Sequence, residues 1–354
     1  MPKLIERMRA INKSYGLVLL PVLVAGSVLT GLWMRDALLS PMQLPAEGVT
    51  YTIPVGAGLT ALASDLASTG MLSSGMWLTL YGRLTAGEGA IKAGEYHLPA
   101  GMTARQFLQK ARSGDVIQHR VTLLEGWSFQ QVLTTLHLQA AIDSQLEGLS
   151  AAAIMGRLQH PGESPEGRFF PDTYNYERGT SDLRILATAY KRMQTILSEE
   201  WLLRDVDLPY ETSYEALTMA SIVEKESGRE ADRSRIAAVF IRRLERGIRL
   251  QSDPTVIFGM GSEFSGDLRR ADLVANTPYN TYVHYGLPPT PISNPSRAAI
   301  HAALNPADTS SLYFVSRGDG SSQFSDTLEE HNRAVRKYQL HGEKQRTTKE
   351  TAVE

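Results

Sequence analysis

Hydrophobic and polar positions follow three different patterns along the chain, and the first is an uncharged run from Ser14 to Met34. About 20 apolar residues span the hydrocarbon core of a bilayer, so this run predicts a transmembrane helix. Trp33 at its far end, followed by Arg35 and Asp36, is typical of an interface anchor and not of a cleaved signal peptide. Four basic residues before the run predict a cytoplasmic N-terminus, with everything after Leu38 outside the membrane. The alternative is a buried helix of a soluble protein.

The second pattern, over residues 39–137, consists of short alternating segments followed by short amphipathic ones. Tyr51–Val55 alternates like a strand and is followed by helical spacing in residues 59–66. The same strand, turn and helix recur at 121–136. The unit resembles the LysM-like glycan-binding module, and the bland alternative is a packing or spacer domain. Residues 91–98 are predicted as strand, turn and strand.

The third pattern, over residues 138–340, consists of longer helical periods separated by polar loops. Helices are predicted within 138–161, 181–203, 212–228 and 231–246. The later loops are rich in Asn, Tyr, Gly and Pro, which suits rigid walls around a polar cleft. Residues 341–354 form a polar tail. The predicted fold class is therefore α+β: a transmembrane helix (1–38), a small LysM-like module (39–137) and a mainly helical domain (138–340).

The helix at 212–228 has signals at both ends. Thr212 and Glu215 have the spacing of a capping box, and Ser227-Gly228 offers a stop at which glycine can adopt a left-handed conformation. Met219, Ile222 and Val223 form an apolar stripe that ends in a carboxylate, Glu226.

Two glutamates at the end of this helix are candidate acids. Glu226 ends the apolar stripe, whereas Glu224 is rotated away from it. A carboxyl held against apolar neighbours has a raised pKa and can carry a proton near neutral pH, as a general acid must. The alternative is that both are solvated surface groups.

Composition excludes several classes of function. The 354 residues contain no cysteine, which excludes disulfides and thiol catalysis, and the net charge of -2 gives no basic excess for nucleic acid. The chain has no HExxH or Cys/His cluster for a metal, no phosphate-binding glycine loop and no GxSxG elbow. We expect no cofactor, no metal and no nucleic-acid partner.

A Gly-, Pro- and aromatic-rich segment at 163–176 supplies further candidates, Asp172 and Tyr174. Asp172 follows a proline, so its simplest role is a turn or N-cap carboxylate. The functional alternative is a wall of aromatic and planar polar groups that contacts sugar.

Several motifs in order resemble the endolytic murein transglycosylases of the YceG-like family. They are Ala220-Ser221-Ile222-Val223-Glu224-Lys225-Glu226, Gln251-Ser252-Asp253-Pro254-Thr255-Val256, Tyr279-Asn280-Thr281-Tyr282 with Gly286-Leu287-Pro288-Pro289, Phe170-Pro171-Asp172-Thr173-Tyr174, and Tyr313-Phe314-Val315. The resemblance runs from the membrane helix to about Leu340. It implies a lysozyme-like catalytic fold and cleavage of the MurNAc–GlcNAc β-1,4 bond without water, leaving a 1,6-anhydroMurNAc end and terminating nascent strands. Glycan strands, the inner membrane and peptidoglycan synthases (penicillin-binding proteins) are the implied partners, with the catalytic domain in the periplasm.

The resemblance also selects the site residues. In related lytic transglycosylases the acid/base glutamate ends a helix and precedes serine, which fits Glu226 and not Glu224. Substrate-binding candidates are Asp172, Tyr174, Gln251, Asp253, Thr255, Tyr279, Asn280 and Tyr282. Asp253, before Pro254, is either a structural hydrogen-bonding group or a second carboxylate. Two other functions stay open: a non-catalytic glycan-binding scaffold for wall synthases, and a hydrolytic muramidase that uses both Glu226 and Asp253.

Overall fold

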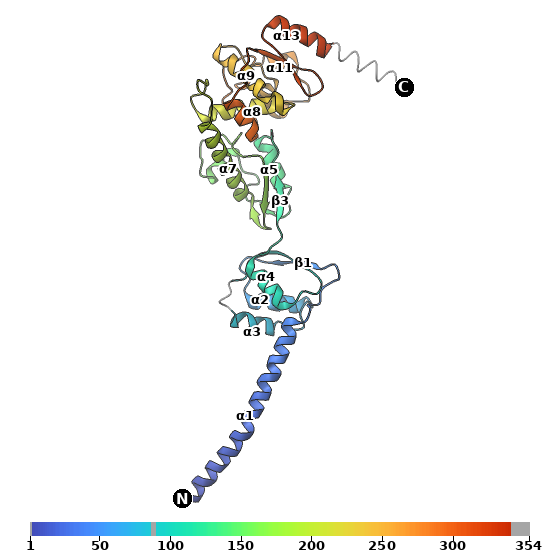
Figure 1. Cartoon of the computed structure of the whole chain (residues 1–354), viewed down its shortest axis with the longest axis vertical. Coiled ribbons are helices and arrows are strands. Elements are labelled where there is room, and N and C mark those ends of the chain that lie inside the picture. Colours follow the sequence, from blue (N-terminus) through green and yellow to red (C-terminus); the bar gives the residue numbers. More distant parts are fainter. Residues whose placement is uncertain (1, 86–89, 341–354) are drawn as a thin grey trace, which may run out of the picture. The chain divides into compact units, whose positions relative to one another are not determined.

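The computed structural model describes residues 2–85 and 90–340, which divide into two compact units (Figure 1). Unit 1 comprises residues 1–119 with 177–179, and unit 2 comprises residues 120–176 and 180–354. The predicted polar tail, 341–354, lies outside the described residues.

Unit 1 is a two-stranded sheet with short helices, joined to a long N-terminal helix. Its elements are α1 (Pro2–Leu39), β1 (Val49–Ile53), α2 (Leu59–Ser68), α3 (Met76–Leu84), β2 (Gly94–Leu98) and α4 (Ala104–Ser113). β1 and β2 pair antiparallel, with Tyr51 opposite Tyr96. Residues 91–98 therefore hold one strand and not the predicted two, because only 94–98 face a partner strand.

The predicted membrane run lies within α1. Within the described part of the chain, Pro21–Leu39 is long and apolar enough to cross a membrane, and almost all of that stretch is exposed. The same length and composition would also suit a signal sequence. The helix continues without a break into unit 1, where Leu38 is buried in the unit's core.

Unit 2 is mainly helical, with small strand pairs at its margins. Its elements are β3 (His119–Thr122), α5 (Phe129–His137), β4 (Ile142–Asp143), α6 (Ala151–Arg157), β5 (Thr173–Tyr176), β6 (Thr180–Ser181), α7 (Asp182–Leu202), α8 (Ser213–Glu226), η2 (Glu230–Asp232), α9 (Arg233–Glu245), α10 (Asp253–Met260), η3 (Gly261–Glu263), α11 (Arg270–Leu273), α12 (Arg297–Leu304), β7 (Tyr313–Ser316), β8 (Ser322–Ser325), α13 (Leu328–Val335) and η4 (Arg336–Leu340). β3 pairs with β5, β4 runs parallel to β6, and β7 and β8 form an antiparallel hairpin.

The boundary between the units differs from the predicted one. The chain divides after residue 119 and not after 137, because β3 and α5 share a core with α7. Val121, Leu133 and Leu186 belong to this core. The two similar strand-and-helix segments at 51–66 and 121–136 therefore lie in different units. Local similarity did not indicate shared packing.

The helix prediction for 138–161 is mostly wrong. Only Ala151–Arg157 is helical there, and the preceding residues form turns and the short strand β4. Two carboxylate contacts explain the irregular backbone: buried Asp182 accepts hydrogen bonds from the amides of Gln145 (3.1 Å) and Leu146 (3.0 Å). A side chain thus satisfies amides that a helix would have paired internally.

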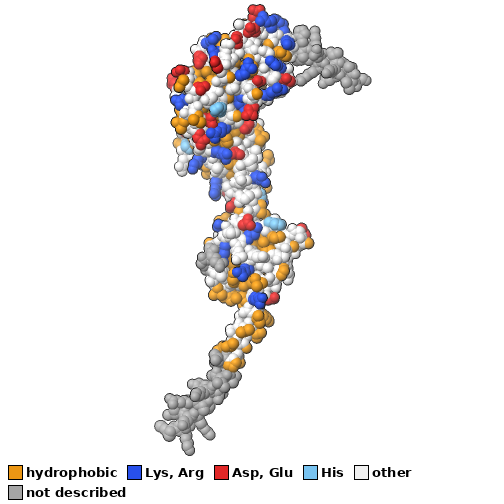
Figure 2. All heavy atoms as spheres, in the orientation of Figure 1, with side chains coloured by type: hydrophobic (Ala, Val, Ile, Leu, Met, Phe, Trp, Pro, Cys, Tyr) orange, Lys and Arg blue, Asp and Glu red, His pale blue; other side chains and the backbone are white. Residues whose placement is uncertain are grey.

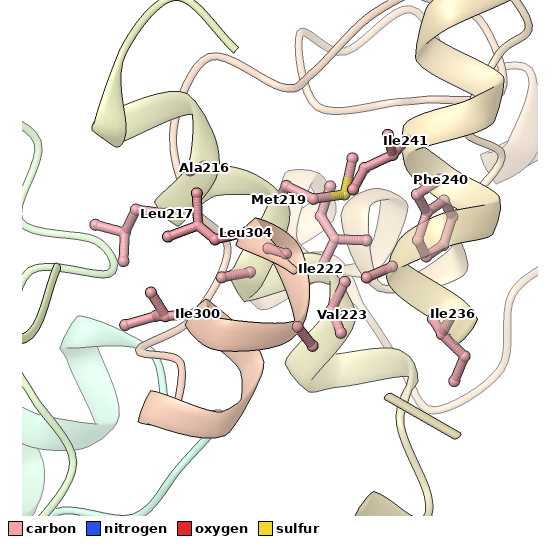
Figure 3. Packing of buried hydrophobic residues seen from close by; sticks show 14 of the residues in the cluster. Ala216, Leu217, Met219, Ile222, Val223, Ile236, Phe240, Ile241, Ile300 and Leu304 are labelled. Atoms are coloured by element: carbon pink, nitrogen blue, oxygen red, sulfur yellow. The ribbon is translucent and has the colours of Figure 1, made fainter. Parts of the chain in front are cut away.

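The main core of unit 2 forms around α8, which packs between α9 and α12 (Figure 3). In this view Met219 and Ile222 of α8 point toward Phe240 of α9, while Leu217 lies near Ile300 of α12. Every residue from Ala216 to Val223 is buried. A helix that is buried all round is held by its neighbours and not by one apolar stripe, so the end of α8 has a fixed position.

Candidate active site

The predicted caps of α8 are confirmed at its start and corrected at its end. Thr212 and Glu215 form the capping box, and the helix ends at Glu226. Ser227 is extended, with φ of -87°, and its Oγ donates to the Val223 carbonyl (2.7 Å). Gly228 does not adopt the predicted left-handed conformation. A Cβ at Gly228 would lie 3.0 Å from the Gly320 carbonyl oxygen, so close backbone approach explains the glycine.

The Glu224 side chain is 8% exposed, and both of its carboxylate oxygens have partners. Its Oε2 accepts hydrogen bonds from the amide (2.9 Å) and hydroxyl (2.5 Å) of Ser296, the N-cap of α12. Its other oxygen lies 3.7 Å from an Arg233 guanidinium nitrogen. This carboxylate ties α8 to α12 and is not available to a substrate.

The Glu226 side chain lines a cavity of about 610 Å³ at the end of α8. The walls come from α9, the segment that leads into α10, the β7–β8 hairpin and α13. The lining residues are Glu226, Gly228, Phe240, Arg243, Leu250, Gln251, Asp253, Tyr282, Tyr313, Phe314, Val315, Ser316, Gly320, Ser322, Leu328, His331, Val335 and Gln339. Segments far apart in sequence thus converge on one carboxyl.

The environment of Glu226 favours its protonated form. Burial raises the pKa of Glu226 to about 7, and the nearby negative charge of Asp253 adds to the rise. Two groups oppose this shift and lower the pKa: the Ser252 hydroxyl, which donates to Glu226 Oε1 (2.6 Å), and the positive charge of Arg243. A carboxyl poised near neutral pH can both give and take a proton.

Ser252 is itself held by two buried threonines. Its amide donates to Thr281 Oγ1 (3.0 Å), and its carbonyl accepts from Thr255 Oγ1 (2.7 Å). The two threonine hydroxyls also lie 2.8 Å apart. Gln251, just before, has a φ of +54°, an unusual conformation for a residue with a side chain. The network therefore imposes a strained backbone that aims the Ser252 hydroxyl at Glu226.

Asp253 lies in the same cavity as Glu226, at the start of α10. The Tyr282 hydroxyl donates to Asp253 Oδ1 (2.6 Å). Burial and the nearby carboxylate raise the pKa of Tyr282, so the phenol stays a donor. Asp253 is thus a hydrogen-bonded, exposed carboxylate beside the candidate acid.

Arg243 forms the buried floor of the cavity. Its guanidinium donates to the carbonyls of Leu312 (2.8 Å) and Leu250 (2.7 Å), and burial lowers its pKa. It also lies over the Tyr313 ring, 5.1 Å from the centroid. One cation thereby joins α9 to the two segments that carry the opposite walls.

Comparison with known proteins identifies the family of this chain. The YceG-like family matches residues 51–337. The chain belongs to the YceG-like family.

Individual relatives cover most of this YceG-like chain. It is 30% identical over 338 residues to a protein named endolytic murein transglycosylase from Bacillus subtilis (strain 168), covering 90% of this chain and 91% of the relative. A protein of the same name from Streptococcus pneumoniae serotype 2 is 28% identical over 90% of this chain and 63% of the relative. The crystal structure of a yceG-like protein from Listeria monocytogenes, 28% identical, matches 82% of this chain and 99% of that chain with a TM-score of 0.51.

The predicted site residues divide into four groups in this family member. Glu226, Gln251, Asp253 and Tyr282 line the cavity. Thr255 supports Ser252 from a fully buried position.

Tyr279 and Asn280 hold loops in place. The Tyr279 hydroxyl hydrogen-bonds to Thr290 Oγ1 (2.9 Å). Fully buried Asn280 donates to the carbonyls of Asp272 (3.1 Å), Leu273 (3.2 Å) and Ala275 (2.8 Å). Neither residue lines the cavity.

Asp172 and Tyr174 lie elsewhere in unit 2, away from the residues that line the cavity. Tyr174 is buried in the second core of the unit, and its hydroxyl donates to the Phe170 carbonyl (2.6 Å). Asp172 is ion-paired with Arg192 (2.6 Å) and lines no part of the cavity. The aromatics of this segment turn inward because burying them removes a large apolar surface from water.

Sequence reasoning did not select Ser252 or Arg243. Ser252 lies inside a recognised motif, but its partner Glu226 is 26 residues away and no local pattern pairs them. Arg243 could have been selected from the sequence. It follows Phe240 by three residues and Val239 by four, so it places a cation on the apolar, inward-facing side of α9. Over residues 2–85 and 90–340, no group of three or more His, Asp or Glu side chains is placed to hold a metal ion.

Proposed function

We propose that this chain is a membrane-anchored endolytic murein transglycosylase in which Glu226 is the general acid and base. The observation that carries the proposal is a single carboxyl with a pKa of about 7 at the end of a fixed helix, facing a 610 Å³ cavity. Ligand pockets are commonly of this size, and a few polar side chains orient the ligand within them. A segment of a sugar chain would fit in the same way. The substrate would be the glycan strand of peptidoglycan, cut at the MurNAc–GlcNAc β-1,4 bond.

The first step uses the protonated form of Glu226. Its carboxyl proton passes to the glycosidic oxygen as the bond from that oxygen to the MurNAc anomeric carbon breaks. Ser252 keeps Glu226 Oε1 in place through its 2.6 Å hydrogen bond. Positive charge developing on the sugar ring would be met by the carboxylates of Glu226 and Asp253.

The second step uses the carboxylate that the first step leaves. Glu226 takes the proton from the MurNAc 6-hydroxyl as that oxygen bonds to the anomeric carbon, which closes the 1,6-anhydro ring. No water is consumed, and the carboxyl is restored for the next turnover. An intramolecular nucleophile is held at high effective concentration, so one acid/base group suffices.

Asp253 supports a second candidate chemistry, hydrolysis. Glycosidases that use water or a covalent intermediate employ two carboxyl groups flanking the bond, and Asp253 shares the cavity with Glu226. The Tyr282 hydrogen bond favours a different role, in which Asp253 orients substrate and raises the pKa of Glu226 by its charge. The chemistry of the product ends separates the two.

The remaining proposals concern the chain's location and architecture. α1 would cross the inner membrane once, with the N-terminus in the cytoplasm and units 1 and 2 in the periplasm, where nascent strands are made by peptidoglycan synthases. Unit 1 would be a LysM-like module and unit 2 a lysozyme-like catalytic domain. The apolar, exposed stretch Pro21–Leu39 and the basic residues before it support this orientation.

Digestion of purified sacculi tests the proposed acid/base. The full chain in detergent should release muropeptides, and Glu226→Gln should reduce the initial rate by at least about a hundredfold, the range of general acid–base catalysis. The exposed Glu230→Gln is the matched control and should keep full activity. Glu224→Gln tests the other glutamate and should keep activity if the variant stays folded by circular dichroism. Full activity in Glu226→Gln would contradict the assignment.

A further inference from the structure

α3 carries apolar side chains on both of its faces. Leu78 and Gly82 are buried against the core of unit 1. On the opposite side Met76, Leu80 and Leu84 are 61%, 40% and 71% exposed. These three residues recur every four positions and form one stripe along the outer face of the helix, called here the α3 stripe. A contiguous apolar patch on a protein surface marks a site that contacts another protein, a ligand or a membrane.

The membrane-proximal end of α1 lies beside this helix. Leu38 is buried in the unit 1 core, and Met34 packs against the same core. α3 contacts α1 at this end, as Figure 1 shows. The core thus fixes α3 relative to the last two turns of α1.

The length of the apolar run sets the depth of that contact. Residues 14–34 span about 30 Å at 1.5 Å per residue, which equals the thickness of the hydrocarbon core. Met34 therefore stands where hydrocarbon gives way to headgroups, and Leu38 is only about 6 Å further along. The headgroup layer is about 5–8 Å thick on each side. An element packed against Met34 to Leu38 lies at the level of this layer.

The polar residues of α3 also suit that depth. Trp77, partly exposed, follows Met76, and tryptophan is enriched at membrane–water interfaces. Exposed Arg83 is seven residues after Met76 and so shares its face, from which a guanidinium can reach lipid phosphate. Trp33 of α1, 69% exposed, stands at the same level. Figure 2 shows hydrophobic side chains gathered on the part of unit 1 from which α1 emerges.

We propose that α3 is a membrane-surface helix whose stripe inserts into the headgroup layer of the bilayer that α1 crosses. Unit 1 is then held against the membrane at two places and does not pivot freely on α1. The occupant of the stripe is lipid because the stripe continues the apolar surface of the membrane-spanning helix. This inference rests on the proposed membrane anchor.

Single cysteines in the full chain test it, because the natural sequence contains none. Leu80→Cys and Leu84→Cys place a bimane fluorophore on the stripe in vesicles of phosphatidylcholine and phosphatidylglycerol. Val28→Cys, at a 55% exposed position in α1, reports on the anchor. Val55→Cys, at a 94% exposed apolar position just after β1, is the water-facing control. All four positions are exposed, so the labels displace no core packing. Quenching is measured with lipids that carry nitroxide at shallow or deep positions and with aqueous iodide.

The expected result is that shallow nitroxide quenches the labels at 80 and 84 several-fold more than the label at 55, while iodide quenches them less. If the labels at 80 and 84 behave like the one at 55 while deep nitroxide quenches the label at 28, the anchor stands and the α3 inference is wrong. Protection from iodide without lipid quenching would mean that a protein covers the stripe, which also overturns the inference. A label at 28 that no lipid nitroxide quenches would contradict the anchor itself.

Discussion

Replacing Glu226 by glutamine should stabilise unit 2 at alkaline pH while removing activity. Burial raises the pKa of Glu226 from its ordinary 4.5 to about 7, so the folded chain holds a proton that the unfolded chain releases. Folding then becomes less favourable as pH rises from about 4.5 to about 7, because ionised Glu226 is poorly solvated in the folded state. Below pH 4.5 the carboxyl is protonated in both states and carries no such cost.

The size of the effect follows from the same two values. At 1.36 kcal/mol for each pKa unit, the rise corresponds to about 3 kcal/mol, and partial exposure to the cavity reduces this to about 2–3 kcal/mol. Glutamine keeps the shape and can still accept from Ser252, but it carries no charge. Glu226→Gln should therefore exceed the natural protein in free energy of unfolding by about 2–3 kcal/mol at pH 8 and by about zero at pH 4.

Urea unfolding of the full chain in detergent measures this difference. Replacing Trp33 and Trp77 by phenylalanine in both proteins leaves Trp127 and Trp201, so fluorescence reports on unit 2 alone. Glu166, whose pKa burial also raises to about 7, is present in both proteins and cancels.

The control is the exposed Glu230→Gln, which makes the same change in net charge outside the cavity. Equal stability of Glu226→Gln and the natural protein at both pH values would refute the claim that the folded chain disfavours ionised Glu226.

Three further substitutions test the cavity. Ser252→Ala removes a hydrogen bond that lowers the pKa of Glu226, so the alkaline limb of the pH–rate profile should move to higher pH; an unmoved limb would contradict the pairing. Tyr282→Phe should reduce kcat/KM about tenfold through the lost charge-assisted bond to Asp253, whereas Tyr279→Phe, whose hydroxyl bonds to Thr290, should leave the kinetics unchanged. Gly228→Ala should impair turnover by pushing the Gly320 turn away, which sacculus digestion measures. Its control, Gly156→Ala, has open space around the new methyl group and should raise the free energy of unfolding by up to about 1 kcal/mol, which thermal melts measure.

Local signals were enough to predict the helix that carries Glu226. Thr212 and Glu215 fixed its start, and the position of Glu226 followed from the helix end, because caps depend on residues within one turn. The same locality explains the errors. Whether Glu224 faced solvent depended on Ser296 and Arg233, which the fold brings from other elements.

Packing between distant segments decided the rest. Tyr174 lies in a Pro- and Gly-rich stretch typical of surface loops, yet its ring is buried by α7 and α5, which no local pattern indicates. Ser252 became part of the site because Thr255 and Thr281 hold its backbone. Sequence spacing constrains neighbours on one element and does not constrain contacts between elements.

The most direct test of the central claim is mass spectrometry of the sugar ends released from sacculi by the full chain. We predict 1,6-anhydroMurNAc ends, each lighter by one water than a reducing MurNAc end, and their loss in Glu226→Gln. Reducing ends made by the natural protein would contradict the transglycosylase mechanism and support hydrolysis by Glu226 and Asp253.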